Sequence, residues 1–452
     1  MDEQADVVVI GLGPGGEYVA GTLAERGLDV VGIDSTLVGG ECPYWGCIPS
    51  KMMIRAANAL AEAHRVDTLA GTASVTADWS KVAARIRDEA TDDWDDAVAV
   101  KRFEDKGGRF VRGLGKLLAP DRVAVGDRTF VAAKAVVVAT GTTPIIPPIP
   151  GLAGTPYWTN RGIIETKELP RSLVALGGGA ISAELAQVLA RFGVHVTVIE
   201  GRDRLIGVEE PEASELLQRI FEREGIDVRL NAKAQSVGYA DGSFTVTMSG
   251  GQVVTAEQLL VATGRRVDLA AFGAGALGVD ESGRSLEADE RMRVQPGVWA
   301  VGDVTGKGAF THVAMYQAKI ATSDILGDPV TPADYAALPR VTFTDPEIGS
   351  VGLTEQSARE QKINVRIGHT DLSASSRGFV HGPGNDGFIK LIVDADRGVL
   401  VGATAAGPSG GEILGLLTVA VHGRVPVSTL RSMIWAYPTF HRATESALDA
   451  LS

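Results

Sequence analysis

Runs of buried hydrophobic residues alternate with short glycine-rich stretches along the chain, and the first such unit lies at the N-terminus. Residues 7–10 (VVVI) are a continuous apolar run of the kind found in a strand that is buried on both faces. They are followed by the glycine-rich stretch 11–16 (GLGPGG), by an amphipathic helix predicted over 18–26, and by an apolar strand over 29–33 that ends at Asp34. This order of strand, turn, helix and strand is the context in which a G-x-G-x-x-G turn binds a dinucleotide.

The same unit returns near the middle of the chain. A strand predicted over 172–176 leads into residues 177–182 (GGGAIS), a helix over 184–192, and a strand over 194–199 that ends at Glu200. The first glycine and the acidic residue are 34 − 11 = 23 positions apart in the first copy and 200 − 177 = 23 in the second. One glycine-rich turn before a helix is often only structural, but two copies with one spacing predict two dinucleotide sites.

The glycines of the first turn have separate physical tasks. Gly11 permits the tight turn, Gly13 lets the backbone approach a pyrophosphate, and Gly16 lets the helix pack closely on the strand. The helix N-terminus offers amide donors and a partial positive charge to the phosphates. Asp34 is placed to accept hydrogen bonds from ribose hydroxyls.

The acidic residue after the second turn bears on the choice of coenzyme. The candidate coenzyme contacts in that turn are Gly177, Gly179 and Ile181. Ser182 replaces the third glycine and is still small. Glu200 would bond both ribose hydroxyls of NADH and repel a 2′-phosphate, which favours NADH. Arg202 and Arg204 keep NADPH open, because either could pair with a 2′-phosphate; the alternative for both is a solvated loop.

Composition limits the remaining classes of function. The chain has 452 residues and a mass of 47.3 kDa, which predicts about two to four domains. Its formal net charge of −13 and pI near 5.1 argue against a nucleic-acid partner. No apolar run approaches the roughly 20 residues needed to span a bilayer, and the early first strand leaves no room for a signal peptide. We therefore expect a cytoplasmic protein without a membrane partner.

The chain has only two cysteines, Cys42 and Cys47. A secreted disulfide-rich domain would have more, and the scattered histidines supply no further zinc ligands, so no metal site is predicted. Residues five apart in a regular helix are separated by roughly 7.5 Å along its axis, too far for a disulfide. The segment must therefore be a distorted turn, built by Pro43, Gly46 and Pro49. Because a helix N-terminus favours a thiolate, we predict a redox-active pair; the alternative is two inert buried thiols.

Several motifs in a fixed order carry a family resemblance. They are the N-terminal glycine turn, residues 39–51 (GGECPYWGCIPSK), 139–144 (ATGTTP), 261–266 (VATGRR), 300–303 (AVGD) and 343–355 (FTDPEIGSVGLTE). Together they resemble the class I pyridine nucleotide-disulfide oxidoreductases, the group of dihydrolipoamide dehydrogenase, glutathione reductase and mercuric reductase. The resemblance covers essentially the whole chain. It implies an α/β fold with two Rossmann-like dinucleotide-binding domains, for FAD and NAD(P), and a C-terminal α+β dimerisation domain.

The resemblance also implies domain boundaries and a homodimer. The expected regions are 1–150 and 268–333 for FAD, 151–267 for NAD(P), and 334–452 for dimerisation. In the last region we expect strands near 388–393 and 399–405 and a helix over 412–421.

Roles for individual residues follow from the same resemblance. Cys47 would be the thiol beside the flavin, and Cys42 the interchange thiol that attacks the substrate. Lys51 would approach the flavin N5 and pair with Glu184. The other implied contacts are Gly115 near the adenosine, Thr140, Gly141 and Gly264 at the ends of nucleotide-binding segments, Asp303 on the ribitol, and Ala309 and Thr311 at a helix aimed at the flavin.

The C-terminal motif departs from the family pattern. Members that reduce disulfides usually end in His-Pro-Thr-x-x-Glu, which the partner subunit lends as a proton shuttle and its orienting carboxylate. Residues 437–442 here read YPTFHR, so Tyr437 occupies the histidine position and Arg442 the glutamate position. An unperturbed tyrosine titrates near 10, which makes His441 the candidate base. The alternative is a structural role for His441 at the dimer interface.

Three classes of function are consistent with these features. The first passes electrons from NAD(P)H through FAD to the Cys42–Cys47 disulfide and on to a small-molecule or protein disulfide. The second delivers them to a quinone or metal ion, as in mercuric reductase, with the thiols assisting. The third is a flavin-bound redox sensor or interaction protein. The retained cysteines favour the first class, loss of the histidine favours the second, and only disuse of the nicotinamide site would favour the third.

Overall fold

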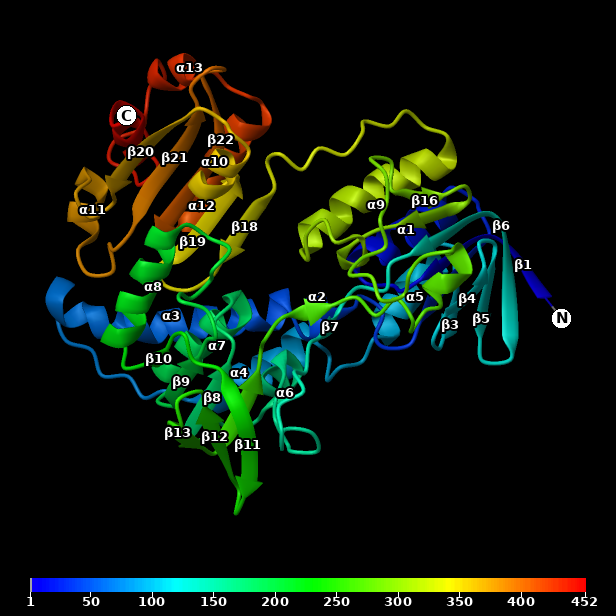
Figure 1. Cartoon of the computed structure of the whole chain (residues 1–452), viewed down its shortest axis with the longest axis horizontal. Coiled ribbons are helices and arrows are strands. Elements are labelled where there is room, and N and C mark those ends of the chain that lie inside the picture. Colours follow the sequence, from blue (N-terminus) through cyan, green and yellow to red (C-terminus); the bar gives the residue numbers. More distant parts are fainter. Residues whose placement is uncertain (1) are drawn as a thin grey trace. The chain divides into compact units, whose positions relative to one another are not determined.

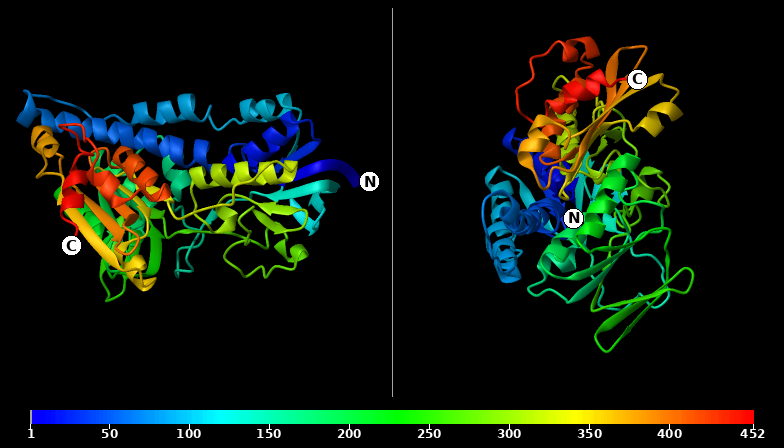
Figure 2. Two further views of the ribbon diagram at one scale, coloured as in Figure 1. Left: turned by 90° about the horizontal axis from the view of Figure 1, so that it is seen from above. Right: turned by 90° about the vertical axis from the view of Figure 1, so that its left-hand side faces the viewer.

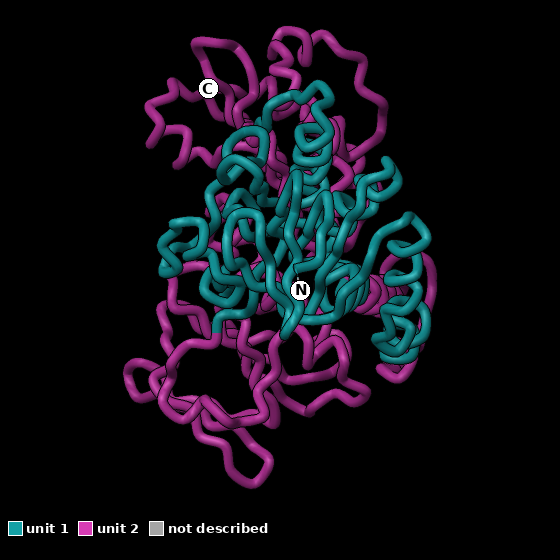
Figure 3. Tube along the Cα trace, turned by 90° about the vertical axis from the view of Figure 1, so that its right-hand side faces the viewer, with its two compact units in different colours: residues 1–50, 83–145, 264–334 teal, residues 51–82, 146–263, 335–452 magenta. Residues whose placement is uncertain are grey.

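The computed structural model describes residues 2–452, and its contacts divide the chain into two compact units. Figure 3 colours them separately. Unit 1 comprises residues 2–50, 83–145 and 264–334, and unit 2 comprises 51–82, 146–263 and 335–452. The functional domain boundaries expected from the sequence stay a prediction.

Unit 1 is built on an eight-stranded sheet. Six of its strands lie in the order β16-β17-β6-β1-β2-β3, in which the neighbours from β17 to β3 are parallel, and β5 and β4 extend β6 as an antiparallel meander. The strands are β1 (Asp2–Ile10), β2 (Val30–Asp34), β3 (Arg109–Arg112), β4 (Lys116–Ala119), β5 (Arg122–Val125), β6 (Arg128–Val138), β16 (Arg293–Gln295) and β17 (Val298–Ala300). The predicted strands over 7–10 and 29–33 are therefore adjacent, with Val7 opposite Val30.

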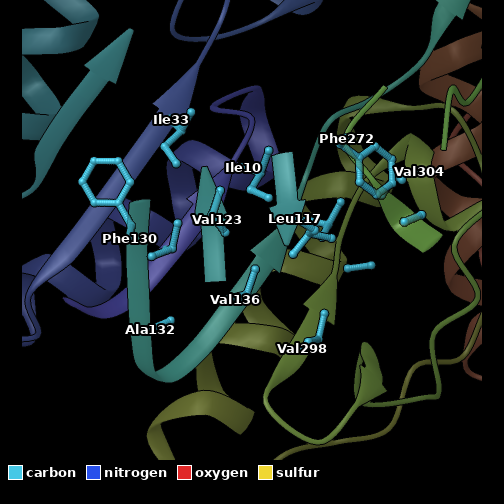
Figure 4. Packing of buried hydrophobic residues seen from close by; sticks show 14 of the residues in the cluster. Ile10, Ile33, Leu117, Val123, Phe130, Ala132, Val136, Phe272, Val298 and Val304 are labelled. Atoms are coloured by element: carbon cyan, nitrogen blue, oxygen red, sulfur yellow. The ribbon is translucent and has the colours of Figure 1, made fainter. Parts of the chain in front are cut away.

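Both faces of this sheet are buried, which explains why its central strands are apolar without alternation. On one face, Val7 and Val9 pack with α1 (Pro14–Glu25), α5 (Ala97–Asp105) and α9 (Thr311–Leu326). Helices α1 and α9 lie side by side, as Figures 1 and 2 show. On the other face, Ile10 and Ile33 join a cluster (Figure 4) that includes Leu117, Phe130, Phe272 and Val298.

Both glycine-motif helices begin four residues earlier than predicted. α1 starts at Pro14 rather than 18, and α7 (Ala180–Arg191) starts at 180 rather than 184. The glycine stretches were interpreted as turns throughout, but each contains the N-cap and first turn of its helix. Proline suits the first helical turn because its missing N–H would be unsatisfied there anyway.

Unit 2 contains a parallel sheet in the order β10-β9-β8-β14 and an antiparallel sheet in the order β11-β12-β13. The parallel strands are β8 (Ser172–Leu176), β9 (His195–Ile199), β10 (Asp227–Arg229) and β14 (Gln258–Val261). The antiparallel strands are β11 (Ala234–Ala240), β12 (Ser243–Met248) and β13 (Val253–Ala256). The predicted second module is thus present, with α7 between β8 and β9.

The C-terminal part of unit 2 is a five-stranded antiparallel sheet in the order β18-β19-β22-β21-β20. Its strands are β18 (Pro339–Thr342), β19 (Glu347–Gly352), β20 (Val365–Asp371), β21 (Phe388–Asp394) and β22 (Val399–Gly407). Helices α12 (Gly410–His422) and α14 (Ala443–Asp449) pack on the face that carries Ile389 and Leu391 (Figure 1). The strands expected near 388–393 and 399–405 and the helix expected over 412–421 are all present.

The remaining elements are shorter or connect the sheets. They are α2 (Glu41–Tyr44), α3 (Cys47–Leu69), α4 (Trp79–Arg85), the π-helix Ile86–Ala90, α6 (Asn160–Glu165), α8 (Pro211–Arg223), α10 (Glu355–Glu360), α11 (Ser376–His381), α13 (Val427–Arg431), the 3-10 turns Ala274–Leu277 and Asp303–Thr305, and the paired strands β7 (Thr143–Pro144) and β15 (Arg265–Arg266). Within residues 2–452, no helix has the length and apolar character needed to cross a membrane. The mixed α/β architecture confirms the predicted fold class.

Candidate active site

The first glycine turn forms an open cradle at the N-terminus of α1. Gly11 has φ +92°, and a Cβ there would lie 2.4 Å from the Ala139 carbonyl oxygen, so the turn requires glycine. At Gly13, the N-cap of α1, a Cβ would meet no atom within 4 Å, and no side chain caps the helix. The uncapped amides and this open space, which a side chain would fill, fit a pyrophosphate.

The acidic residue at the end of β2 closes the same turn. One carboxylate oxygen of Asp34 accepts a hydrogen bond from the Leu12 amide at 2.7 Å, and the other accepts one from the Thr36 amide at 2.7 Å. Asp34 is buried. Its side chain therefore holds the glycine turn, and its contact with a ribose stays a prediction.

A second set of polar groups in unit 1 gathers around Asp303. The Thr142 hydroxyl donates to the Asp303 carboxylate at 2.7 Å, and Arg265 donates to the Thr142 hydroxyl at 2.9 Å and to its carbonyl at 2.6 Å. Burial raises the pKa of Asp303, while the Thr142 hydrogen bond and the charge of Arg265 act in the opposite direction. Thr142 and Arg265 lie inside the motifs 139–144 and 261–266 but were not predicted as site residues.

Four other predicted flavin contacts, and Gly264 at the end of the NAD(P) segment, lie in unit 1 in different settings. Gly141 has φ +68° and open space where a Cβ would stand, whereas a Cβ on Gly115 would lie 2.8 Å from Ile10. Thr140 and Ala309 are exposed, and Gly264 accepts a hydrogen bond from the Ile145 amide at 2.9 Å.

The cysteine segment consists of two helices rather than one turn. Cys42 lies in the short helix α2, and Cys47 is the first residue of the long helix α3. The chain changes direction at Gly46, where a Cβ would lie 3.0 Å from the Glu41 carbonyl oxygen. The two thiols therefore do not share a regular helix, as the disulfide geometry requires. Pro49 lies in the first turn of α3, where it costs no hydrogen bond.

The two cysteines are in contact as thiols. Their side chains form a hydrogen bond, and this bond together with burial raises the pKa of Cys42. The Cys47 sulfur lies 3.5 Å from the hydroxyl oxygen of Thr311, the first residue of α9. The N-termini of α3 and α9 thus meet at the thiols, and the partial positive charge of both helix ends favours an anion there.

Lys51 follows Cys47 by one helical turn, and its ammonium lies 2.9 Å from the carboxylate of Glu184 in α7. The Glu184 carboxylate is almost fully buried, with 8% of the side chain exposed, whereas 36% of the Lys51 side chain is exposed. The ion pair suggested by the family resemblance is thus present in unit 2. The catalytic roles of both residues stay predictions.

The second glycine turn repeats the first in unit 2. Gly177 has φ +100°, and a Cβ on Gly179, the N-cap of α7, would meet no atom within 4 Å. Glu200 accepts hydrogen bonds from the amides of Gly178 at 2.5 Å and Arg202 at 2.8 Å. The uncapped N-terminus and the open space fit a second pyrophosphate.

Two further candidate residues lie beside this turn. Ile181 is 38% exposed in the first turn of α7. The Arg204 guanidinium donates to the Gly207 carbonyl at 2.9 Å, which folds its side chain back onto its own loop.

The C-terminal motif 437–442, which differs from the family pattern, lies in unit 2. Tyr437 is 69% exposed, and the Arg442 guanidinium lies 5.6 Å from the centre of its ring. Arg442 pairs with Glu445 at 2.8 Å, while a ring nitrogen of His441 lies 3.3 Å from the Thr439 hydroxyl. Within unit 2, therefore, the carboxylate that follows His441 binds Arg442 and the histidine contacts a hydroxyl.

Comparisons with known proteins identify the family. Residues 5–318 match the model described as pyridine nucleotide-disulphide oxidoreductase, and residues 338–448 match the dimerisation domain of that family. The chain belongs to the pyridine nucleotide-disulphide oxidoreductase family. Dihydrolipoyl dehydrogenase from Chlorobaculum tepidum is 32% identical over 468 residues, covering 99% of this chain and 97% of that protein.

Two further similar proteins have names that mention metal ions. Mercuric reductase from Acidithiobacillus ferrooxidans is 32% identical over 456 residues, covering 97% of this chain and 81% of that protein. The solved Cu(II) complex of the HOCl-induced flavoprotein disulfide reductase RclA from Escherichia coli has a TM-score of 0.86 and 26% identity, with 99% of each chain covered.

The family confirms the general activity and the cofactors. The chain is an FAD-dependent disulfide oxidoreductase that uses NAD(P)H, and its C-terminal region is a dimerisation domain. The cradle at Gly13, with Asp34 and Asp303, is the set of residues that would hold FAD. When bound, FAD supplies the two-electron relay between nicotinamide and disulfide.

Proposed function

We propose that this protein is an NADH-dependent reductase in which the Cys42–Cys47 disulfide takes up two electrons and two protons and passes them to a disulfide acceptor. The observation that carries the proposal is the hydrogen-bonded thiol pair at the N-termini of α3 and α9. The pair lies in the same compact unit as the Gly13 cradle and Asp303. An inert pair of packed thiols would not need a second helix N-terminus beside it.

In this proposal the two thiols have different tasks. Cys47 is the thiol beside FAD. Cys42 attacks one sulfur of the acceptor disulfide, which forms a mixed disulfide while the other sulfur leaves as a thiol. Cys47 then attacks the Cys42 sulfur, which re-forms the Cys42–Cys47 disulfide and releases the second thiol. Because its pKa is raised, Cys42 stays protonated at neutral pH and needs a base before it can attack. We propose that a second subunit of a homodimer supplies that base as His441, with Tyr437 donating a hydrogen bond.

An anaerobic titration with NADH tests the electron path. A long-wavelength thiolate-to-flavin absorbance band after two electrons would support a connected disulfide, whereas direct bleaching of the flavin would contradict it. Cys42→Ser should keep NADH oxidation by artificial acceptors and lose disulfide turnover. His441→Ala should lower disulfide turnover by about 10²–10⁴ if it is the base, and unchanged turnover would leave His441 a structural residue.

The exposed Tyr437 favours a second candidate acceptor class, a quinone or a metal ion. An aromatic residue with 69% of its surface exposed replaces the usual base, and the relatives include a mercuric reductase and a copper-bound flavoprotein disulfide reductase. A panel of disulfides, quinones and metal ions separates the classes when Tyr437→His is compared with the wild type. Disulfide turnover that rises in Tyr437→His while quinone or metal turnover falls would support the second class.

Glu200 supports NADH as the coenzyme. Its carboxylate is held by two backbone amides beside the predicted ribose position, where it would repel a 2′-phosphate. A higher kcat/KM for NADH than for NADPH, with the ratio falling in Glu200→Ala, is the expected result. The cytoplasm is the proposed location, because its reducing environment keeps such thiols in use.

A further inference from the structure

Both carboxylate oxygens of Glu184 are engaged, and they bind different parts of the chain. One oxygen accepts from the Lys51 ammonium at 2.9 Å, and the other accepts from the backbone amide of Phe343 at 2.8 Å. Phe343 lies between β18 and β19, at the start of the dimerisation domain. The buried carboxylate therefore connects Lys51 to a residue 159 positions from Glu184.

Phe343 also contacts Lys51 directly. The Lys51 nitrogen lies 4.7 Å from the centre of the Phe343 ring, over its face. A cation in this position is attracted by the negative face of the ring, and the attraction is greater when water is partly excluded. Lys51 is thus held between a carboxylate and an aromatic ring, which restricts a side chain that otherwise has four rotatable bonds.

Residues 343–345 bind side chains on one face of α7 through hydrogen bonds and an ion pair. Glu184, Gln187 and Arg191 are spaced three and four residues apart, so their side chains project from the same face. Gln187 exchanges two hydrogen bonds with the Asp345 backbone, at 2.8 and 2.9 Å, and the Arg191 guanidinium lies 2.9 Å from the Asp345 carboxylate. Each contact fixes the backbone that carries the Phe343 ring.

The carboxylate of Asp345, at the end of this segment, pairs with two arginines, Arg191 and Arg65. Burial alone would raise its pKa, but Arg191 and Arg65 outweigh burial and hold the pKa of Asp345 below its ordinary value. The Arg65 guanidinium lies 2.7 Å from the same carboxylate. Arg65 belongs to α3, the helix that carries Lys51.

We propose that residues 343–345, at the start of the dimerisation domain, position Lys51, with the ring of Phe343 and the carboxylate of Glu184 acting as its two supports. The inference rests on the proposed electron path from NADH to the disulfide, and on the predicted place of Lys51 beside the flavin in that path. It assigns Phe343 as a positioning residue, because Phe343 acts through Lys51 and not on the reacting atoms.

The test measures two quantities in the holoenzyme. One is the midpoint potential of the flavin. The other is the rate at which an acetylating reagent modifies the Lys51 amine, followed by mass spectrometry. Lys51→Ala should shift the potential most. Phe343→Leu should shift it in the same direction by a smaller amount, slow flavin reduction by NADH about three- to tenfold, and raise the acetylation rate. Phe343→Tyr keeps the ring face and should behave like the wild type.

A matched control separates positioning from loss of packing. Phe244→Leu removes a fully buried ring in β12 and should lower the melting temperature while leaving the potential unchanged. If Phe343→Leu does not fold, Gln187→Ala loosens the same segment and should give the same direction of change in both measurements. The inference fails by itself if Lys51→Ala shifts the potential but Phe343→Leu changes neither the potential nor the acetylation rate. Gln187→Ala takes the place of Phe343→Leu in this comparison if Phe343→Leu does not fold. An unchanged potential in Lys51→Ala would overturn the inference together with the proposed role of Lys51.

Discussion

The two glycine-rich turns, one in each compact unit, are built with nearly the same contacts. Gly11 and Gly177 have φ values of +92° and +100°, and a Cβ on either would lie 2.4 Å from a carbonyl oxygen, of Ala139 and Ala262 respectively. In each turn a carboxylate 23 positions later accepts from the amide that follows the first glycine. The repeated geometry indicates that the first glycine and the acid act together to hold the turn.

The turns differ at the third position of the motif. A Cβ on Gly16 would lie 2.0 Å from the Gly11 carbonyl oxygen, whereas the second turn contains Ser182 at the corresponding position. Ser182 is fully buried, and within residues 2–452 its hydroxyl finds no hydrogen-bond partner. The second helix therefore leaves room for a Cβ that the first helix excludes, so the third glycine is a requirement of unit 1 alone.

Substituting the first glycine in each turn should give the largest effects and should separate the two cofactors. Gly11→Ala forces a side chain into a carbonyl at positive φ, a strain of about 1–3 kcal/mol that also distorts the cradle, and should yield protein without flavin. Gly177→Ala should retain flavin and raise the KM for NADH more than tenfold. The ratio of flavin absorbance to protein absorbance measures the first result, and steady-state kinetics measure the second. Equal flavin loss in the two variants would contradict the assignment of the turns.

Two partly buried carboxylates, Asp303 in unit 1 and Asp345 in unit 2, offer a second contrast through their opposite pKa shifts. The pKa of Asp345 is lowered in the folded protein. Its carboxylate therefore contributes fully to the free energy of unfolding above its unfolded-state pKa, and this contribution is lost as the pH falls through its folded-state pKa. The pKa of Asp303 is raised, so its contribution is present below its unfolded-state pKa and is lost as the pH rises through its folded pKa.

Asp345→Asn should therefore lower the free energy of unfolding at pH 7 by about 3 kcal/mol, because it leaves Arg191 and Arg65 without that partner. The difference from the wild type should shrink as the pH falls below about 4. Urea denaturation at a series of pH values measures this. A difference that grows toward low pH would contradict the lowered pKa of Asp345 in the folded protein.

The third position should distinguish the turns by a smaller amount. Gly16→Ser should destabilise the protein by about 2 kcal/mol, since the added atoms collide with backbone that cannot easily move. Ser182→Gly is the matched change in unit 2 and should be nearly neutral, because the cost of glycine in a helix, about 1 kcal/mol, is offset by loss of the buried hydroxyl without a partner. Thermal unfolding of the two variants compares them, and equal losses would mean that both helices pack equally closely.

The smallest expected effect is a gain in stability. Ser182→Ala removes a buried hydroxyl without a hydrogen-bond partner, within residues 2–452, and keeps the Cβ. The free energy of unfolding should rise by about 1 kcal/mol. A loss of stability together with a raised KM for NADH would instead indicate that the hydroxyl contacts the coenzyme.

The local parts of the fold and site were predictable, and the long-range parts were not. Strands 7–10 and 172–176 were predicted because continuous apolar runs bounded by glycine signal buried strands. The starts of α1 and α7 were placed four residues late, because a glycine-rich stretch does not show where a turn becomes a helix. The contacts of Thr142 with Asp303 and of Arg265 with Thr142 were missed, because residues 161 and 123 positions apart meet only through sheet packing.

Sequence by itself determined the family and the two glycine-rich turns, and it predicted the redox pair, because each is encoded within a short segment of the chain. Tertiary structure decided that Cys42 and Cys47 straddle a break between two helices and meet the N-terminus of α9. It also decided that Glu184 supports both Lys51 and Phe343. Such contacts depend on how helices and strands from distant parts of the chain pack, and the residues themselves carry no local signal of it.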